Sequence, residues 1–308
     1  MKRAIVTGAT GFIGSWLTLE LLKSDYEVTV LVRNPNKLLP EIRENSNLII
    51  VKKDLNQLLA GDIPSNNYDV FFNLGWAGVS PEQKNDVQLQ VSNIPMALNS
   101  LKICNALGCK LFIATGTVAE YALTTDVMDL NAKQSPNDMY GCAKVSAHYF
   151  LEVESRKINQ PFIWTVVSST FGERRTDNNI ITYTIKELLT GQKPQYGMLE
   201  QMWDFLYVSE VVRALRLIGE KGTPGKVYGI GSGQYKPLKD YILQIRDVID
   251  PSLELGIGEK PSLSKQSFSS CVNIYELIRD TGFQPQISFD EGIRRTVEYW
   301  RTKVLNEG

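Results

Sequence analysis

The sequence has very little of the chemistry on which metal sites and disulfide frameworks depend. Its 308 residues include a single histidine, His148, and four cysteines, none of which forms a CxxC pair. Zinc sites and small disulfide-bonded domains use such residues in pairs at short spacings. We therefore predict no metal site. We assign His148 no role, because a lone histidine is more often a packing or surface residue than a ligand.

The sequence also lacks an excess of either charge. Lys and Arg together number 33 and Asp and Glu 34, which gives a formal net charge of -1. Binding to nucleic acid or to an acidic membrane surface usually needs an excess of positive charge, and no apolar run here is long enough to cross a membrane. We expect small-molecule partners, with no nucleic acid and no membrane. Unpaired cysteines and the lack of a leader-like segment before the first predicted strand favour a reducing cytoplasm.

What the sequence does have is a regular alternation of short apolar runs and longer amphipathic stretches. The apolar runs are RAIVT, EVTVLV, LIIV, DVFFNL, KLFIAT and FIWTVV, and helices are predicted near 12–23, 82–107 and 138–158. Strands that alternate with helices predict β-α-β units and a parallel sheet. Because the runs are continuously apolar, both faces of the sheet should be covered, which predicts a doubly wound α/β Rossmann fold.

The alternation becomes irregular after residue 170, where helices and turns mix without a repeat. We predict a larger domain over 1–170, to which 205–230 returns. A smaller, mixed α/β substrate-binding domain would consist of 171–204 and 231–308.

The stretch TGATGFIG (7–14) follows the first strand and opens the first helix. Gly8, Gly11 and Gly14 therefore stand where the backbone must turn tightly and come close to a pyrophosphate. The spacing is GxxGxxG rather than GxGxxG, but its place in the first β-α unit favours a dinucleotide site. The other cofactor contacts expected from this loop are Thr10, Phe12 and Ile13.

The end of the second strand bears on the choice of cofactor. An NAD site usually has an acidic residue there, which binds the ribose 2′-hydroxyl. Val32 cannot accept that bond, whereas Arg33 could meet a 2′-phosphate; the alternative is a solvated surface arginine. We predict NADP, used as NADPH, with NAD as the alternative. Asp54, after the third strand, either receives the adenine amino group or caps a helix.

The stretch YGCAK places Tyr140 and Lys144 four residues apart, on one face of a predicted helix. This spacing alone does not distinguish a catalytic pair from one turn of an ordinary helix. Together with the dinucleotide loop, however, YGCAK resembles the YxxxK pair of the short-chain dehydrogenase/reductase superfamily, specifically its extended branch of nucleotide-sugar epimerases, dehydratases and ketoreductases. The resemblance covers almost the whole chain. It is supported by GTVAEY (116–121), SPNDMYGCAK, DNNIITYTI (177–185), DFLYVSEVVRAL (204–215) and TGFQPQISFDEGIRRTVEYW (281–300).

The resemblance implies a catalytic set of Thr117, Tyr140 and Lys144. Tyr140 would exchange a proton with the sugar oxygen and Thr117 would donate a hydrogen bond to it, while hydride moves between the sugar carbon and nicotinamide. An unperturbed phenol is a slow acid or base near neutral pH. We therefore expect Lys144 and the positive ring of the oxidised cofactor to lower the pKa of Tyr140. Lys144 would also hold the nicotinamide ribose.

Other contacts follow from the same resemblance. Asn93 would lie near the nicotinamide and Ser168 near its carboxamide, although both could equally be local caps. Asn179 corresponds to an asparagine at the diphosphate of the sugar nucleotide, and Tyr196 lies in KPQYG, which resembles the edge strand against the base. The remaining expected cofactor contacts are Leu55, Leu74 and Thr115. The expected substrate contacts are Trp76, Thr117, Ser169, Asn179, Tyr196 and Trp203.

Two stretches depart from the family pattern. Trp203 stands where family members commonly have an arginine that binds the diphosphate, so Arg174, Arg175 or Lys265 could supply the charge, or Trp203 could stack on the ligand. The fourth strand ends in NLGWAG instead of the usual His-x-Ala-Ala, so Trp76 either shapes the pocket or packs.

Within the extended branch, epimerases keep NAD bound and return the hydride, whereas reductases consume free NADPH. Because Arg33 favours NADPH, we predict a ketoreductase that converts a nucleotide-activated 4-keto-6-deoxyhexose into a deoxysugar. A sugar 4-epimerase is the alternative. A dehydratase is disfavoured because TGTVAEY lacks the adjacent Asp-Glu pair of family dehydratases. A non-catalytic NADP-binding protein is disfavoured because such proteins tend to lose the tyrosine and lysine.

The helices predicted near 82–107 and 138–158 carry apolar residues on more than one face, for example Leu98, Tyr149 and Phe150. One face can cover the sheet while the other meets a twofold partner. We therefore expect a homodimer through an intermolecular four-helix bundle, as in many relatives. The alternative is coverage by loops of the same chain.

Overall fold

The computed structural model describes residues 1–65, 67–121, 127–261 and 269–307. Its centre is a seven-stranded sheet in the order β11-β6-β5-β4-β1-β2-β3, in which all neighbouring strands are parallel. The chain runs outward from β1 to β3 and returns to β4 beside β1. This order confirms the predicted doubly wound α/β fold, and it creates a crevice where the order reverses. The strands are β1 (Lys2–Thr7), β2 (Tyr26–Val32), β3 (Leu48–Lys52), β4 (Val70–Asn73), β5 (Phe112–Thr117), β6 (Phe162–Val167) and β11 (Val227–Ile230).

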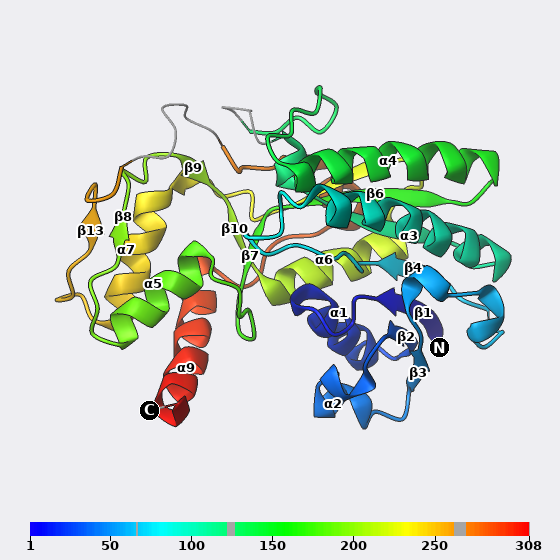
Figure 1. Cartoon of the computed structure of the whole chain (residues 1–308), viewed down its shortest axis with the longest axis horizontal. Coiled ribbons are helices and arrows are strands. Elements are labelled where there is room, and N and C mark those ends of the chain that lie inside the picture. The colour runs from blue at the N-terminus through cyan, green and yellow to red at the C-terminus, as the bar shows by residue number, and fades with distance from the viewer. Residues whose placement is uncertain (66, 122–126, 262–268, 308) are drawn as a thin grey trace.

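Helices cover both faces of this sheet (Figure 1). One face carries α3 (Val87–Ala106) and α4 (Met139–Lys157), which pack on each other and bury residues such as Leu101 and Leu151 with the strands. The other face carries α1 (Phe12–Lys23) and α6 (Val208–Lys221), which pack together through their own apolar side chains. Strands β4 and β6 are buried along their whole length, because neither face meets water. This accounts for the continuous apolar runs in the sequence.

A second, smaller part of the chain lies beyond the ends of β6 and β11 (Figure 1). Its core is a cluster of aromatic and branched side chains from three helices, among them Ile185, Tyr241 and Trp300. Its helices are α5 (Ile180–Leu189), α7 (Leu238–Ile249) and α9 (Phe289–Glu307). Its short strand pairs are β7 (Ser169–Phe171) with β10 (Phe205–Tyr207), β8 (Gln195–Tyr196) with β13 (Gly256–Ile257), and β9 (Met202–Trp203) with β12 (Lys236–Pro237).

The short segments complete the larger part. They are α2 (Pro40–Arg43), α8 (Tyr275–Thr281) and the 3-10 turns η1 (Pro35–Lys37), η2 (Leu55–Gln57), η3 (Ala60–Asp62) and η4 (Val118–Tyr121). Helix α8 packs against α6 and β11, and Leu277 and Phe283 join the apolar cluster beneath α1. Residues 275–283 thus return to the larger part, although they lie in the range predicted for the second domain.

The helix predicted near 82–107 begins later in the structure. Residues 80–86 form turns, and α3 starts at Val87 after Asp86, whose side chain accepts a hydrogen bond from the Leu89 amide at 3.0 Å. An acidic residue in this position caps the free amide groups of a first helical turn. Lys84 consequently lies in a turn instead of a helix, and it lines the cleft described below.

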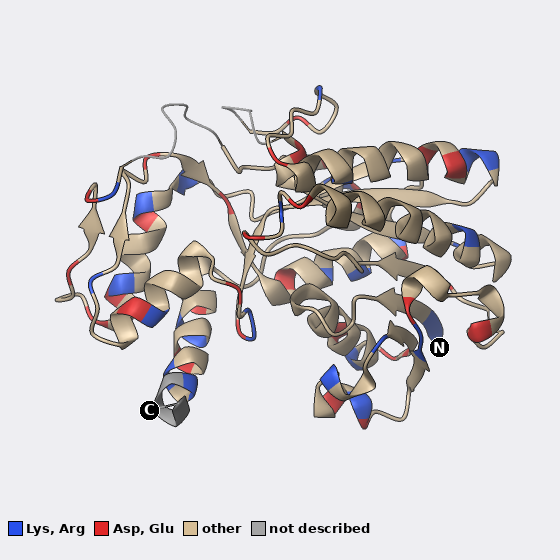
Figure 2. Cartoon of the chain, in the orientation of Figure 1, with Lys and Arg blue, Asp and Glu red and all other residues tan. Residues whose placement is uncertain are grey.

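Charges of both signs are interspersed over the two parts of the molecule (Figure 2). This agrees with the near balance of acidic and basic residues in the sequence. Within the described residues, no helix is both long and apolar enough to cross a membrane.

Candidate active site

A large cleft of about 1400 Å³ opens at the carboxyl ends of the parallel strands. Residues after β1, β2, β4, β5 and β6 line one side, and residues of the smaller part, including Trp203, line the other. Ligands of open α/β sheets bind at this edge, where the strand order reverses. The cleft is therefore the place where the predicted site residues are expected to meet.

The glycine loop lies at the bottom of this cleft and needs its glycines. Gly8 has a φ of +74°, and a Cβ there would lie 2.9 Å from the carbonyl carbon of Leu74. A Cβ on Gly14 would lie 2.0 Å from the carbonyl oxygen of Gly8, so α1 could not approach β1 as it does. Thr10, Gly11, Phe12 and Ile13 also line the cleft. The loop thus forms a cradle of backbone amides at a helix start, which fits a pyrophosphate.

Arg33 projects from the end of β2, where it is exposed and lines the cleft, while the side chain of Val32 is buried. Asp54 lines the same region, and its carboxylate accepts hydrogen bonds from the amide and side chain of Asn56 at 2.9 and 3.1 Å. Asp54 therefore caps η2, which was the second of its two predicted roles. Leu55 lines the cleft beside it.

Thr117, Tyr140 and Lys144 come together in the cleft. Thr117 ends β5, whereas the other two lie on the first turns of α4, which Asp138 caps by accepting from the Gly141 amide at 2.7 Å. A Cβ on Gly141 would lie 2.5 Å from the carbonyl oxygen of Ala119. The missing side chain at 141 thus lets α4 approach the turn after Thr117, which brings the phenol and the threonine hydroxyl together.

Lys144 is almost fully buried and has two close neighbours. Its Nζ donates to the Thr115 carbonyl at 2.6 Å and lies 3.8 Å from the centre of the Trp76 ring. The Tyr140 ring centre is 5.9 Å from the same nitrogen. An indole face attracts a cation, so Trp76 is a direct neighbour of the predicted catalytic lysine.

The protein environment shifts the pKa of both groups. Burial raises the pKa of Tyr140 to about 12, although a hydrogen bond with Thr117 acts in the opposite direction. Burial also lowers the pKa of Lys144 to about 7, against the attraction of Glu120. The protein without its cofactor therefore raises the pKa of Tyr140, opposite to the predicted direction, because the loss of hydration outweighs the effect of nearby charges. The positive ring of an oxidised cofactor would have to lower this pKa.

The segment that carries Trp76 is held by two side chains of α3. The indole Nε1 donates to Gln90 Oε1 at 2.9 Å, and Gln90 Nε2 donates to the Gly78 carbonyl at 2.6 Å. Asn93 accepts from the Ala77 amide at 2.7 Å and donates to the Ala77 carbonyl at 3.1 Å. Asn93 lines the cleft, but its amide group anchors this segment, which agrees with a local role.

Two serines follow β6 along the cleft wall. Ser168 is 5% exposed, and its hydroxyl has no partner among the described residues, which fits a site for an incoming polar group such as a carboxamide. Ser169 accepts from Trp203 Nε1 at 2.9 Å. Trp203 is thereby oriented at the cleft, as a stacking residue would need to be.

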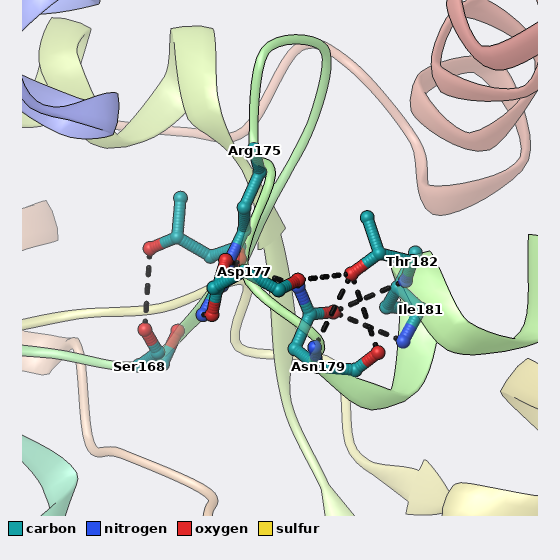
Figure 3. A network of polar contacts seen from close by, with 7 residues as sticks. Ser168, Arg175, Asp177, Asn179, Ile181 and Thr182 are labelled. Atoms are coloured by element: carbon teal, nitrogen blue, oxygen red, sulfur yellow. Dashed lines mark hydrogen bonds and ion pairs between the residues drawn. The ribbon is translucent and has the colours of Figure 1, made fainter. Parts of the chain in front are cut away.

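The loop between β7 and α5 contains a polar network (Figure 3). Arg175 meets the carboxylate of Asp177 through two contacts, at 2.7 and 2.9 Å, and also donates to the Thr170 carbonyl. Arg174 pairs with Glu41 at 2.7 Å. Both arginines line the cleft, but each already has a carboxylate partner. Lys265, the third candidate for the missing charge, lies outside the described residues.

Asn179 and Tyr196 do not line the cleft. Asn179 caps α5 by accepting from the amides of Ile181 and Thr182 at 3.0 and 3.2 Å (Figure 3). Tyr196 is buried, and its hydroxyl lies 2.6 Å from that of Thr184. Their polar groups are used within the protein, so the geometry adds no support for a substrate role.

Two residues that the sequence did not indicate lie beside the predicted catalytic residues. Lys84 lines the cleft with its ammonium 5.2 Å from the centre of the Tyr140 ring, and no described carboxylate pairs with it. The sequence did not indicate Lys84, because residues 82–107 were predicted to be a helix. Glu120 is fully buried behind Thr117. The sequence indicates Glu120 only by its place three residues after Thr117, the predicted catalytic threonine. An acidic residue near a turn is usually exposed, so its burial was not expected.

Comparisons with known proteins bear on the family and the fold of this chain. A model of the NAD dependent epimerase/dehydratase family matches residues 4–231. The dTDP-glucose 4,6-dehydratase of Shigella flexneri is 27% identical over 176 residues, which cover 54% of this chain and 48% of that protein. The chain thus spans about half the length of the first curated dehydratases that it matches. An uncharacterized UDP-glucose epimerase of Bacillus subtilis (strain 168) is 24% identical over 320 residues, with 96% of this chain and 97% of that protein covered.

Solved structures share the fold over nearly the whole chain. A UDP-N-acetylglucosamine 4-epimerase from Methanobrevibacter ruminantium M1, in complex with UDP-N-acetylmuramic acid, superposes with a TM-score of 0.87 at 23% identity, covering 98% of this chain and 99% of that one. A UDP-glucuronic acid 4-epimerase from Bacillus cereus, in complex with UDP-glucuronic acid and NAD, gives a TM-score of 0.87 at 22% identity with the same coverage. At these identities the likeness establishes a common fold.

Proposed function

This chain belongs to the NAD-dependent epimerase/dehydratase family, and from that premise we propose that it uses NADPH to reduce a nucleotide-activated 4-keto-6-deoxyhexose to the corresponding deoxysugar. The observation that carries this proposal is Arg33, exposed at the cleft end of β2, with buried Val32 where an acid would bind the ribose of NAD. A guanidinium in that position favours a 2′-phosphate. A cofactor that is used free, rather than kept, favours a reductase.

The residues of the cleft fit a nicotinamide dinucleotide. The glycine cradle suits its pyrophosphate, and the Ser168 hydroxyl, buried without a partner among the described residues, suits its carboxamide. The cofactor supplies hydride to the ketone carbon when it is bound. The chain supplies the rest: Tyr140 gives its phenolic proton to the ketone oxygen, and Thr117 donates a hydrogen bond to the same oxygen. Charged Lys144 stabilises the phenolate that remains.

A sugar 4-epimerase is the second candidate. It is favoured by the comparisons, because 4-epimerases are among the proteins of the same fold and some of those structures contain NAD. An epimerase would use the same three residues but would return hydride to the opposite face of the sugar. A non-catalytic NADP-binding protein is disfavoured because Tyr140 and Lys144 meet in one cleft.

The experiment is to incubate the protein with a panel of 4-keto-6-deoxy sugar nucleotides and either NADPH or NADH. Loss of the absorbance of the reduced nicotinamide, with formation of a deoxysugar nucleotide, is the expected result. Interconversion of a sugar nucleotide and its 4-epimer without added cofactor, and without net reduction, would favour the epimerase instead.

Arg33→Ala tests the cofactor choice within the same assay. We expect Kd for NADPH to rise about tenfold or more and Kd for NADH to change little, because only NADPH has a phosphate for the guanidinium. Arg43→Ala is the matched control, since Arg43 is a nearby arginine that does not line the cleft. Equal affinities of the unmodified protein for the two cofactors would remove the reason to prefer a reductase.

The cytoplasmic location expected from the sequence stays a prediction. We also propose that the protein forms a homodimer through α3 and α4. Leu101 and Leu151 face the sheet, but Val91, Tyr149, Phe150 and Val153 are between 53% and 56% exposed. An apolar face of this kind on two adjacent helices suits a four-helix contact with a second copy. Light scattering at micromolar concentration tests this, and a monomeric mass would contradict it.

A further inference from the structure

Glu120 is a charged residue with no contact to water, placed directly behind the catalytic group. Its side chain is in η4 and is 0% exposed. One carboxylate oxygen accepts from the Thr117 amide at 2.8 Å, and the other accepts from Trp164 Nε1 at 3.2 Å. A Cβ on Gly116 would lie 2.2 Å from the first oxygen, so a glycine is needed there for the carboxylate to reach the strand. A buried carboxyl group that accepts two hydrogen bonds is held in one position.

Glu120 and Lys144 hold the same short segment of β5 from its two ends. The carboxylate accepts from the amide of Thr117, and the ammonium donates to the carbonyl of Thr115, with only Gly116 between them. The end of the strand is therefore fixed by an acid and a base. Neither group is in ion-pair contact with the other, so they interact through their charges across the strand end.

Among the described residues, the titratable groups that face Glu120 come from two elements. From α4 come Lys144, Tyr140 and His148, and Tyr121 is its neighbour in η4. His148 stacks on Trp164 with ring centres 4.7 Å apart, and burial lowers its pKa to about 4, so it is neutral near pH 7. Burial raises the pKa of both tyrosines, which are uncharged as well. Lys144 is the one cation in this set.

We propose that Glu120 is a positioning residue, which holds Thr117 through its amide and keeps Lys144 protonated, so that Tyr140 stays functional at higher pH. The proposal deepens the proposed function, because it takes Tyr140 as the group that exchanges the proton. Burial raises the pKa of Glu120 to about 7, while Thr117, Lys144 and Trp164 oppose the shift. Its ionisation therefore falls near neutral pH, where a change in its charge can affect activity.

The sign of the effect follows from the two charges. Burial lowers the pKa of Lys144 to about 7, and ionised Glu120 raises it. Removal of the carboxylate charge should therefore let Lys144 lose its proton at a lower pH. Activity that needs charged Lys144 would then fall earlier on the alkaline side.

The kinetic experiment compares Glu120→Gln with Trp164→Phe. For Glu120→Gln we expect the alkaline limb of kcat/KM to move to lower pH by about one unit, and kcat at the optimum to fall about tenfold with little change in KM. Trp164→Phe is the matched control, because it disturbs the same contact and removes a hydrogen bond but leaves the carboxylate charge. Its alkaline limb should move much less than that of Glu120→Gln, because loss of one donor raises the pKa of Glu120 but keeps the ionisable carboxyl group.

Two outcomes would overturn the proposal. One is an unchanged pH profile in Glu120→Gln, with activity lowered equally at every pH, as a purely structural residue would produce. The other is an equal movement of the limb in both variants, since the charge would then not be its cause. Thermal melting of each variant checks that both are folded at the assay temperature.

A second measurement needs no substrate. Because Trp164 donates to Glu120, its fluorescence should report the ionisation of the carboxyl group. The difference between the unmodified protein and Trp164→Phe, followed from about pH 5 to about pH 9, isolates this indole. We expect one transition near neutral pH that is lost in Glu120→Gln, while that of His148 falls below the range. Lack of the transition in the unmodified protein would overturn the proposal, even if Glu120→Gln does not fold.

The two measurements also separate this proposal from the proposed function. If no keto-sugar nucleotide is turned over but the Trp164 transition is present and lost in Glu120→Gln, the proposed function fails and the ionisation of Glu120 stands. If turnover is observed without the transition, the proposed function stands and the inference on Glu120 fails.

Discussion

Two walls of the cleft hold their charged groups in opposite ways. At the end of β5, Lys144 and Glu120 are buried apart from each other, with only neutral groups in direct contact. In the loop between β7 and α5, Arg174 pairs with Glu41. Arg175 pairs with Asp177 (Figure 3). The first arrangement shifts pKa values, because burial without a paired charge disfavours ionisation. The second fixes the shape of a loop and cancels its charge.

A charged group that lines the cleft is therefore not, for that reason alone, available to a ligand or to a proton. The β5 wall has the properties of a proton-handling site, whereas the loop would have to give up an ion pair before it could bind a phosphate. A substrate would then gain affinity from stacking of Trp203 on its base or sugar, rather than from a free arginine at its diphosphate. Variants on each wall can separate these two modes.

The largest effect is expected on the β5 wall, from Tyr140→Phe. Because the change removes only the hydroxyl that handles the proton, kcat should fall about 10³-fold while cofactor affinity stays the same. Steady-state kinetics and cofactor titration measure the two effects. Tyr149→Phe on the exposed side of the same helix is the matched control and should leave kcat unchanged. Near-normal activity of Tyr140→Phe would show that this wall does not handle the proton.

Thr117→Val should have a smaller effect on the same wall. A single donor to a developing oxyanion is worth about 3 kcal/mol, so kcat should fall about 10²-fold. Thr165→Val on the neighbouring strand is the control, because its hydroxyl is buried and bonds to the Ala114 carbonyl at 3.3 Å. If both variants lose activity equally, the loss reflects packing rather than oxyanion stabilisation.

Trp203→Ala tests the facing wall. Stacking of an aromatic ring on a base is typically worth about 1–3 kcal/mol, and we expect a loss of nucleoside diphosphate affinity in that range by calorimetry. Trp203→Arg, which introduces the arginine common in the family, should lose less and should make binding more sensitive to salt. Tyr275→Ala, an exposed aromatic outside the cleft, is the control. Unchanged affinity in Trp203→Ala would make this tryptophan a packing residue.

The smallest effect is expected from Asp177→Asn, which leaves Arg175 without its carboxylate. If the ion pair competes with a phosphate, nucleoside diphosphate affinity should increase about threefold, in line with the modest value of a partly exposed pair. Asp250→Asn changes an acid with a similar local turn outside the cleft, and should have no effect. A decrease in affinity would mean that the network in Figure 3 shapes the site instead of masking a charge.

The fold, and the meeting of Thr117, Tyr140 and Lys144 in one cleft, could be predicted because they depend on local patterns. Continuous apolar runs marked the strands, and the glycine loop and YGCAK lie at fixed places relative to those strands. Helix α1 begins at Phe12 and ends at Lys23, as predicted. Such signals need only neighbours in the sequence.

What could not be predicted depends on contacts between distant segments. Burial of Glu120 requires the turn after β5, Trp164 on β6 and the glycine between them to meet. The direction of the Tyr140 pKa shift depends on burial, which the sequence does not give. Lys84 lies near Tyr140 where two distant segments meet, since Asn85 accepts from the Met139 amide at 3.2 Å.

The contact between Trp76 and Lys144 makes the motion of one segment a matter of proton linkage. Opening of the segment that Gln90 and Asn93 anchor would return Lys144 to water and restore its ordinary, higher pKa. The closed form, whose lysine pKa is lowered to about 7, then binds fewer protons than the open form between about pH 7 and the ordinary lysine value. Closure is most favourable above that ordinary value and weakens as pH falls toward 7. Hydrogen exchange at the Ala77 amide, which donates to Asn93, should accordingly show extra opening on acidification through this window, beyond the intrinsic effect of pH on exchange.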